Sequence, residues 1–213
     1  MHIQTIKYHD YIESIPKSGR HILAQQNENE ILVYQAFNER IANYAVANQT
    51  FGGNHYKMER MSWIKPNFLW MMYRSGWAEK KDQERILAIW MDKRFFDKIL
   101  KSAVFTSFKQ EFYESQDDWK AKMKQSDVRL QWDPDHDIYG NKQTRKAIQL
   151  GLKGSFLKTF VKDQIIRIED ITEFVRKQKE RIQERNLELL EIPIETAYIP
   201  NDVEIRRQIG LEN

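Results

Sequence analysis

Short apolar runs along this chain predict strands, and helix signals directly follow two of them. The run 31–36 (Ile-Leu-Val-Tyr-Gln-Ala) is apolar and partly β-branched, which is typical of a buried strand. Asn38 then stands where a helix N-cap belongs, and the helix is expected to end near Thr50. The run 85–91 predicts a second buried strand, with Asp92 as the cap of the helix that follows.

Residues 60–77 form the densest aromatic segment of the chain, and they also carry its clearest helix boundaries. Pro66 has no backbone N–H and fits the first turn of a helix, so residues 63–65 before it are expected to be extended. Gly76 stands where a C-terminal glycine belongs, which predicts a helix of about ten residues. The cations of this segment are Arg60, Lys65 and Arg74.

The second half of the chain continues with strands and helices. Residues 128–132 alternate apolar and polar side chains, the pattern of a half-buried strand. Residues 133–144 are then predicted to form a loop, followed by strands at 147–152 and 164–168. A long and mostly polar helix is expected from 172 to about 190.

About five strands are therefore interspersed with about five helices. Several of these helices are too short for regular parallel crossovers, which favours an α+β fold over a doubly wound sheet. The expected architecture is a single α+β domain with a mixed central sheet of about five strands and flanking helices. Its core is 31–172, preceded by a loosely packed N-terminal arm (1–30) and followed by a C-terminal helix and an extended tail (173–213).

Composition limits the environment and the chemistry. The 213 residues include no cysteine, which excludes disulfides and thiolate metal sites and fits a reducing compartment. The first ten residues lack the apolar region of a signal peptide, and no window approaches a transmembrane span. We therefore expect a cytoplasmic protein without membrane contact.

Charge is unevenly distributed, although the net charge is only +3. Residues 142–167 contain seven cations and one anion, Asp163, which is a candidate phosphate-binding segment. A solvated face is the alternative, because Lys and Arg side chains are mostly exposed in folded proteins.

Several kinds of site are excluded by spacing. The chain has neither a glycine-rich phosphate loop nor a Gly-x-Ser-x-Gly elbow. The segment Asp133-Pro-Asp-His-Asp imitates the start of a calcium loop, but Ile138 and Thr144 stand where glycine and glutamate are needed. The histidines show no metal-ligand spacing, so no metal site is expected. Asp133, directly after a predicted strand, remains a candidate site residue.

Aromatic and cationic side chains together predict a cleft for a nucleotide or a single-stranded base. Arg can pair with phosphate and stack on aromatic rings, and Tyr34, Trp63 and Trp132 are candidate walls. Cations lying over the rim of a core are the alternative. Gln131 and Gln149 each lie in a predicted apolar strand, where their amides need either a ligand or, more commonly, neighbouring backbone.

Six segments carry a resemblance to a known family. They are Val33-Tyr34-Gln35-Ala36, Met61-Ser62-Trp63-Ile64-Lys65-Pro66, Trp70-Met71-Met72-Tyr73-Arg74-Ser75-Gly76-Trp77, Gln83-Glu84-Arg85, Gln131-Trp132-Asp133-Pro134 and Ile148-Gln149-Leu150-Gly151-Leu152. From about residue 20 to residue 172, the chain resembles domain of unknown function 4291. That name implies no reaction.

A second resemblance, at the level of the fold, is to ADP-ribosyltransferases. Residues 34–37 (Tyr-Gln-Ala-Phe) leading into a helix are similar to the Tyr-His-Gly-Thr strand of those enzymes. Gln35 replaces the histidine that holds the nicotinamide ribose, and Gln149 is the nearest occupant of the place of the catalytic glutamate. The resemblance implies an NAD-using transferase, and these two departures count against the activity.

The sequence therefore predicts a protein directed at a nucleotide or nucleic acid, with NAD as the cofactor of an enzymatic form. The alternatives are a non-catalytic RNA-binding module and an interaction protein whose aromatic segment is only core. No catalytic residue is assigned, and the oligomeric state is left open. The candidate ligand-binding residues are Tyr34, Gln35, Arg60, Trp63, Lys65, Arg74, Gln131, Asp133 and Gln149.

Overall fold

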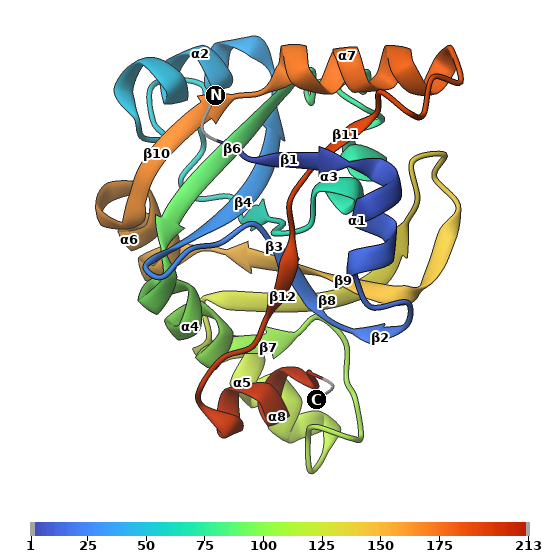
Figure 1. Ribbon diagram of the computed structural model, residues 1–213. Coiled ribbons are helices and arrows are strands. Elements are labelled where there is room, and N and C mark those ends of the chain that lie inside the picture. The colour runs from blue at the N-terminus through green and yellow to red at the C-terminus, as the bar shows by residue number, and fades with distance from the viewer. Residues whose placement is uncertain (1–2, 212–213) are drawn as a thin grey trace.

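Two β-sheets meet in the middle of the computed structural model, which describes residues 3–211 (Figure 1). The smaller sheet is antiparallel and has the order β10-β6-β4. Its strands are β4 (Glu30–Phe37), β6 (Arg85–Asp92) and β10 (Ile165–Asp170). All three were predicted from short apolar runs, and the predictions are confirmed to within a few residues.

The larger sheet has five strands and is mixed. It consists of β2 (Gly19–Arg20), β9 (Lys142–Leu152), β8 (Val128–His136) and β7 (Ala103–Phe105), with β5 (Ser62–Ile64) also paired to β9. β8 and β5 run antiparallel to β9, whereas β2 pairs with β9 and β7 pairs with β8 in parallel. The predicted α+β fold with a mixed sheet of about five strands is confirmed.

The predicted loop over 133–144 is wrong, because β8 continues to His136 and β9 begins at Lys142. A buried ion pair between Asp135 of β8 and Arg145 of β9 adds to the pairing of these strands, with Arg145 Nε 2.8 Å from Asp135 Oδ2. The chain reverses only after Asp137, whose Oδ1 accepts hydrogen bonds from the backbone N–H groups of Tyr139 and Asn141, each at 2.9 Å.

The two sheets are joined where β4 passes β5. Tyr34 N–H donates to the carbonyl oxygen of Lys65 at 2.7 Å, and Lys65 N–H donates to that of Tyr34 at 3.1 Å. These bonds form an isolated bridge and are not continued as a ladder, so the C-terminal end of β4 and the start of β5 part from each other. This fork between β4 and β5 is the feature on which the candidate site depends.

Two helices follow the strands of the fork. α2 (Glu39–Asn48) is capped by Asn38, as predicted. α3 (Phe68–Ser75) is capped by Asn67, so Pro66 precedes the cap, and Gly76 ends the helix with φ +58° as predicted. The other helices are α1 (Tyr8–Ser14), α4 (Lys93–Lys101), α5 (Gln116–Gln125), α6 (Gly154–Thr159) with the π-helical turn η1 (Phe160–Gln164), α7 (Thr172–Gln183) and α8 (Val203–Ile209).

The three-stranded sheet is a middle layer with a hydrophobic core on each face. Val33 and Ile89 face one core, which α2, α4 and the larger sheet complete. Tyr34 and Ala88 face the other, which α3 and α7 cover. Figure 1 shows α2 and α7 along one end of the molecule and α4, α5 and α8 at the opposite end, below the larger sheet. No helix within residues 3–211 has the length and apolar character needed to span a membrane.

The N-terminal segment is more closely packed than its polar sequence indicated. β1 (Thr5–Lys7) pairs with β11 (Glu191–Pro193), and β3 (Ile22–Ala24) pairs with β12 (Thr196–Tyr198). Tyr11, on α1 between them, is fully buried. The predicted long helix is also shorter than expected, since α7 ends at Gln183, and the chain after it returns to form these two strand pairs.

Candidate functional site

A cleft of about 580 Å³ opens in the fork between β4 and β5. Gln35 lies on its β4 side, and Trp63 and Lys65 lie on its β5 side. The loop after α2 supplies Lys57 and Arg60 to the same cleft, and its other lining residues include Asn38, Tyr56, Ser62, Met71 and Asp82. Four of the nine predicted ligand-binding residues, Gln35, Arg60, Trp63 and Lys65, therefore line one hollow.

Lys65 is the most unusual residue of the cleft. Its side chain is only 7% exposed, and its Nζ makes no hydrogen bond or ion pair within residues 3–211. Burial and, to a smaller extent, the nearby Arg74 guanidinium lower its pKa, Asp133 partly offsets them, and the resulting pKa is about 8. Burying an ammonium group without a hydrogen-bonded anion is costly, so the neutral amine and the cation are close in free energy here.

Gln35 ties the two sides of the fork together. Its Nε2 donates to Ser62 Oγ at 2.7 Å and to the carbonyl oxygen of Trp63 at 3.2 Å. Its Oε1 is buried and has no hydrogen-bond partner within the described residues. Since buried acceptors are nearly always paired, this oxygen marks a place where a ligand donor would be favourable.

Asp133 is held by two glutamines that face each other across β8 and β9. Gln131 and Gln149 are register partners, and their Nε2 atoms donate to Asp133 Oδ1 and Oδ2, each at 2.7 Å. The sequence predicts neighbouring backbone as the commoner partner of these two amides. In the structure both amides bind the Asp133 carboxylate instead. The cluster lies close enough to Lys65 for its charge to raise the pKa of that amine.

Gly151 explains how Trp63 reaches the cleft. The two residues are register partners in β5 and β9. A Cβ atom at Gly151 would lie 2.5 Å from Met61 Sδ and 3.0 Å from Trp63 Cε2, so only glycine lets both side chains lie against the strand. The indole is thereby held at the edge of the cleft, partly exposed.

The structure places three of the aromatic and cationic candidates elsewhere. Tyr34 is fully buried and packs edge-to-face on Phe68, with ring centroids 5.6 Å apart, so its ring belongs to the core. Trp132 packs against the core that Val33 and Ile89 face. Its Nε1 donates to the carbonyl oxygen of Ile209 at 2.7 Å. Arg74 is exposed on α3, close to Lys65 but outside the lining of the cleft.

Glu195 binds the start of α3, the helix that follows Lys65. This buried carboxylate accepts hydrogen bonds from Phe68 N–H at 2.6 Å, Asn67 Nδ2 at 2.9 Å and Tyr11 Oη at 2.7 Å. It therefore fixes the start of α3 at Phe68, three residues after Lys65. Burial raises its pKa to about 8 in spite of these donors. No local pattern in the sequence indicates this contact, because Glu195 comes from the predicted extended tail.

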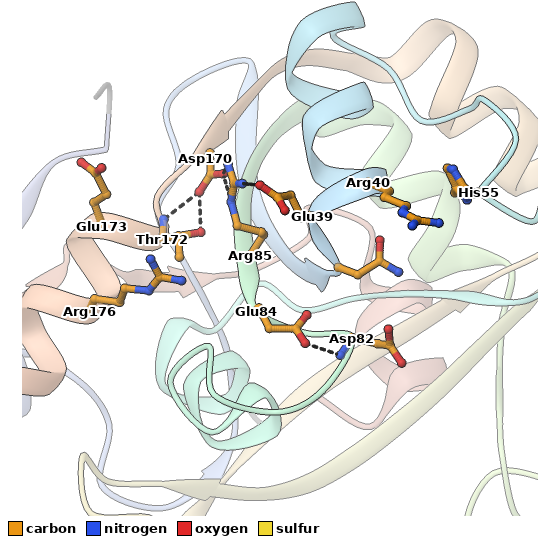
Figure 2. A pocket seen from close by; sticks show the side chains of 11 residues that line it. Glu39, Arg40, His55, Asp82, Glu84, Arg85, Asp170, Thr172, Glu173 and Arg176 are labelled. Carbon is orange, nitrogen blue, oxygen red and sulfur yellow. Dashed lines mark hydrogen bonds and ion pairs between the residues drawn. The ribbon is translucent and has the colours of Figure 1, made fainter.

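A second hollow of about 900 Å³ adjoins the cleft, with Asn38, His55 and Asp82 common to both linings. Figure 2 shows Arg40 and His55 on one side of it and Glu173 and Arg176 on the other. Arg85 lies between them but is committed to an ion pair with Asp170, with Nε 2.6 Å from Oδ2. Its lining contains more carboxylates than cations, whereas the cleft in the fork has three cations and one carboxylate.

The basic segment 142–167 does not form one continuous set of free cations. Arg145 is buried in its pair with Asp135. Arg167 pairs with Glu169 at 3.0 Å and lies over the Trp90 ring. Among residues 3–211, no three His, Asp or Glu side chains gather closely enough to hold a metal ion.

Comparison with known protein families gives one match that covers most of the chain. The model described as "Domain of unknown function (DUF4291)" matches residues 21–198, which include β4, β5, α3 and the whole lining of the cleft. The match also reaches Glu195, beyond the part of the chain that the sequence motifs covered. No curated protein matches the chain.

Proposed function

The chain belongs to the family Domain of unknown function (DUF4291), whose description assigns no reaction, and we propose from its own cleft that it binds a small anionic ligand of the nucleotide class. The single observation that carries this proposal is the Nζ of Lys65 at the cleft, which belongs to a mostly buried residue and has no hydrogen-bond or ion-pair partner within residues 3–211. A bound phosphate supplies the missing counter-charge, and the protonated amine then becomes the stable form.

Neighbouring groups support the same ligand class. Lys57 and Arg60 add positive charge to the lining, against the single carboxylate of Asp82. The Trp63 indole offers a flat surface on which a base can stack. Gln35 Oε1 accepts from a ligand donor such as a ribose hydroxyl or a base amino group. Charge, stacking and an acceptor in one cleft fit a nucleotide better than inorganic phosphate.

Thermal unfolding in the presence of ADP, NAD or inorganic phosphate tests the proposal. At 100 times its dissociation constant, a ligand stabilises the folded state by about 2.7 kcal/mol. We expect a nucleotide to raise the melting temperature and Lys65→Met to abolish the rise. Lys158→Met is the matched control, because Lys158 is exposed on α6 and outside the cleft lining. Equal shifts in both variants would contradict a role for Lys65, and the absence of any nucleotide shift in the unmodified chain would contradict the proposal.

An NAD-using transferase is the second candidate, and the position of Asp133 favours it. This chain lacks the catalytic glutamate of the ADP-ribosyltransferases that it resembles, because Gln149 is the nearest occupant of that place. Gln149 holds Asp133, whose charge acts on the cleft lysine. In this candidate the bond between nicotinamide and the ribose carbon breaks, nicotinamide leaves, and a nucleophile such as water or an acceptor side chain bonds to that carbon, while Asp133 stabilises the positive charge that develops on the ribose. Release of nicotinamide from NAD, lost in Asp133→Asn, is the measurement; NAD binding without release would leave only the binding function.

RNA is the alternative ligand, and the salt dependence of binding distinguishes an RNA-binding module from a nucleotide cleft. Affinity for RNA that depends on many dispersed cations falls steeply with salt. Binding governed by one buried cleft is less sensitive, because buried charges are screened less. If RNA binds, with a steep salt dependence and no effect of Lys65→Met, the RNA-binding module replaces the nucleotide cleft as the function.

A further inference from the structure

Lys65 differs from every other lysine in the described chain. It is the one lysine within residues 3–211 whose side chain is buried. Its Nζ is unpartnered there, whereas the amine of Lys80 donates to the carbonyl oxygen of Arg74 at 2.9 Å. Because Lys65 lines the cleft, a small molecule that enters the fork reaches it directly. Burial, access and the lack of a partner together describe a reactive amine.

Burial is the main cause that favours the neutral form of Lys65. Arg74 of α3 acts against protonation, and Asp133 of β8 acts for it, but its charge does not cancel the effect of burial. With a pKa of about 8, half of the Lys65 amines are neutral at pH 8. For an ordinary lysine, roughly one amine in 300 is neutral at that pH. The other titratable groups lining the cleft are His55, Tyr56, Lys57, Arg60 and Asp82.

We propose that Lys65 is a nucleophilic amine that condenses with the carbonyl carbon of an anionic aldehyde or ketone bound in the cleft. The amine nitrogen attacks the carbonyl carbon, and the adduct then loses water to leave a C=N bond. Both hydrogens of the neutral amine leave with the carbonyl oxygen, so no oxidant or reductant is needed. Asp133 of β8, which accepts hydrogen bonds from Gln131 and Gln149, is the carboxylate whose charge acts on the Lys65 amine.

The cations that line the cleft indicate where the anionic group of the substrate binds. Lys57 and Arg60 lie in the loop between α2 and β5, whereas Lys65 directly follows β5. A phosphate or carboxylate on these cations leaves the Lys65 amine free to meet a carbonyl group elsewhere in the same molecule. This inference shares the anion-binding cleft of the proposed function and adds a covalent step to it.

Pyridoxal 5′-phosphate is a suitable probe, since it is an aldehyde that carries a phosphate. The full chain is incubated with a small excess of the probe at pH 8, reduced with borohydride and mapped by peptide mass spectrometry. We expect Lys65 to be labelled at least tenfold faster than exposed lysines such as Lys158. Pyridoxal, which lacks the phosphate, should label Lys65 more slowly. The mapping compares lysines within the unmodified chain, so it does not depend on the folding of a variant.

Matched variants sharpen the result. Lys65→Arg keeps the positive charge but removes the reactive amine, so it should eliminate the fast labelling, while Lys158→Arg should leave it unchanged. Labelling of Lys65 no faster than Lys158 would overturn the inference, and a nucleotide shift lost in Lys65→Met would then still support the proposed function. Fast labelling of Lys65 in a chain that nucleotides neither stabilise nor protect would support the inference and refute the proposed function.

Discussion

Gln35 crosses the fork between the two sheets and donates from Nε2 to Ser62 Oγ at 2.7 Å. No ladder of backbone hydrogen bonds continues from the isolated Tyr34–Lys65 bridge. The Gln35–Ser62 hydrogen bond therefore links β4 and β5 beyond that bridge, at the cleft. Gln35 Oε1 is buried and has no hydrogen-bond partner within residues 3–211. The same side chain therefore stabilises the fold and carries the acceptor that the proposed function assigns to a ligand.

Gln35→Ala is expected to destabilise the protein by about 1–3 kcal/mol, because it leaves Ser62 Oγ and the Trp63 carbonyl without their buried donor. Urea denaturation measures the change. Ser62→Ala is the matched control and should cost less, since Gln35 keeps its bond to the Trp63 carbonyl. An equal or greater cost for Ser62→Ala would show that Gln35 is not the tie between the strands.

Affinity for an anionic nucleotide is expected to fall as the pH rises above 8. The pKa of Lys65 is about 8 in the free protein, and a bound phosphate raises it, so binding takes up a proton above pH 8. The association constant then falls by up to about tenfold per pH unit. Calorimetry in buffers of different ionisation enthalpy measures the proton uptake. Lys65→Arg should show no such fall up to pH 9.5, and a flat profile in the unmodified chain would contradict the assignment.

Glu195 gives an expected dependence of stability on pH. Its pKa is raised from about 4.5 to about 8 in the folded protein, so the folded state holds the proton more tightly than the unfolded chain does. Its contribution to stability is therefore complete below pH 4.5 and is lost as the pH rises to 8, by up to about tenfold in the folding constant per pH unit.

Glu195→Gln removes this titration, and urea denaturation at pH 5, 6.5 and 8 measures its effect. Relative to this variant, the unmodified chain should lose stability as the pH rises. The opposite trend would mean that the three donors from Phe68, Asn67 and Tyr11 hold the carboxylate ionised.

The buried pair of Arg145 and Asp135 should respond strongly to truncation of one partner. Arg145→Ala is expected to cost about 3–5 kcal/mol, since it leaves the Asp135 carboxylate buried without its cation. Lys142→Ala, at an exposed position of the same strand, should change stability by less than about 0.5 kcal/mol. The double variant Arg145→Ala/Asp135→Ala should lose less than the two single variants together. A small effect of Arg145→Ala would instead return this cation to the candidate RNA-binding residues.

Local signals in the sequence were reliable where chain neighbours decide the structure. The caps at Asn38 and Asp92, the end at Gly76 and the strands at 31–36 and 85–91 all depend on contacts within a few residues. The orientation of Tyr34 could not be read in the same way. A continuous apolar run has no alternation to show which side chain faces which core.

The candidate site was predictable only in part. Lys65 and Trp63 could be singled out because they lie beside a proline that forces an extended chain. That Gln131 and Gln149 bind Asp133 depends on the register of β8 and β9, which single-chain patterns do not specify. Glu195 and Tyr11 meet Asn67 from opposite ends of the chain, and nothing local to any of the three residues signals that contact.

The pairing of β1 with β11 and of β3 with β12 has a consequence for biosynthesis. Residues 191–198 leave the ribosome long after the N-terminal strands with which they pair. Contacts so distant along the chain slow folding and leave the unpaired edges of β1 and β3 open to wrong partners in the meantime. A nascent chain thus holds every residue that lines the cleft before it holds Glu195, the carboxylate that fixes the neighbouring helix.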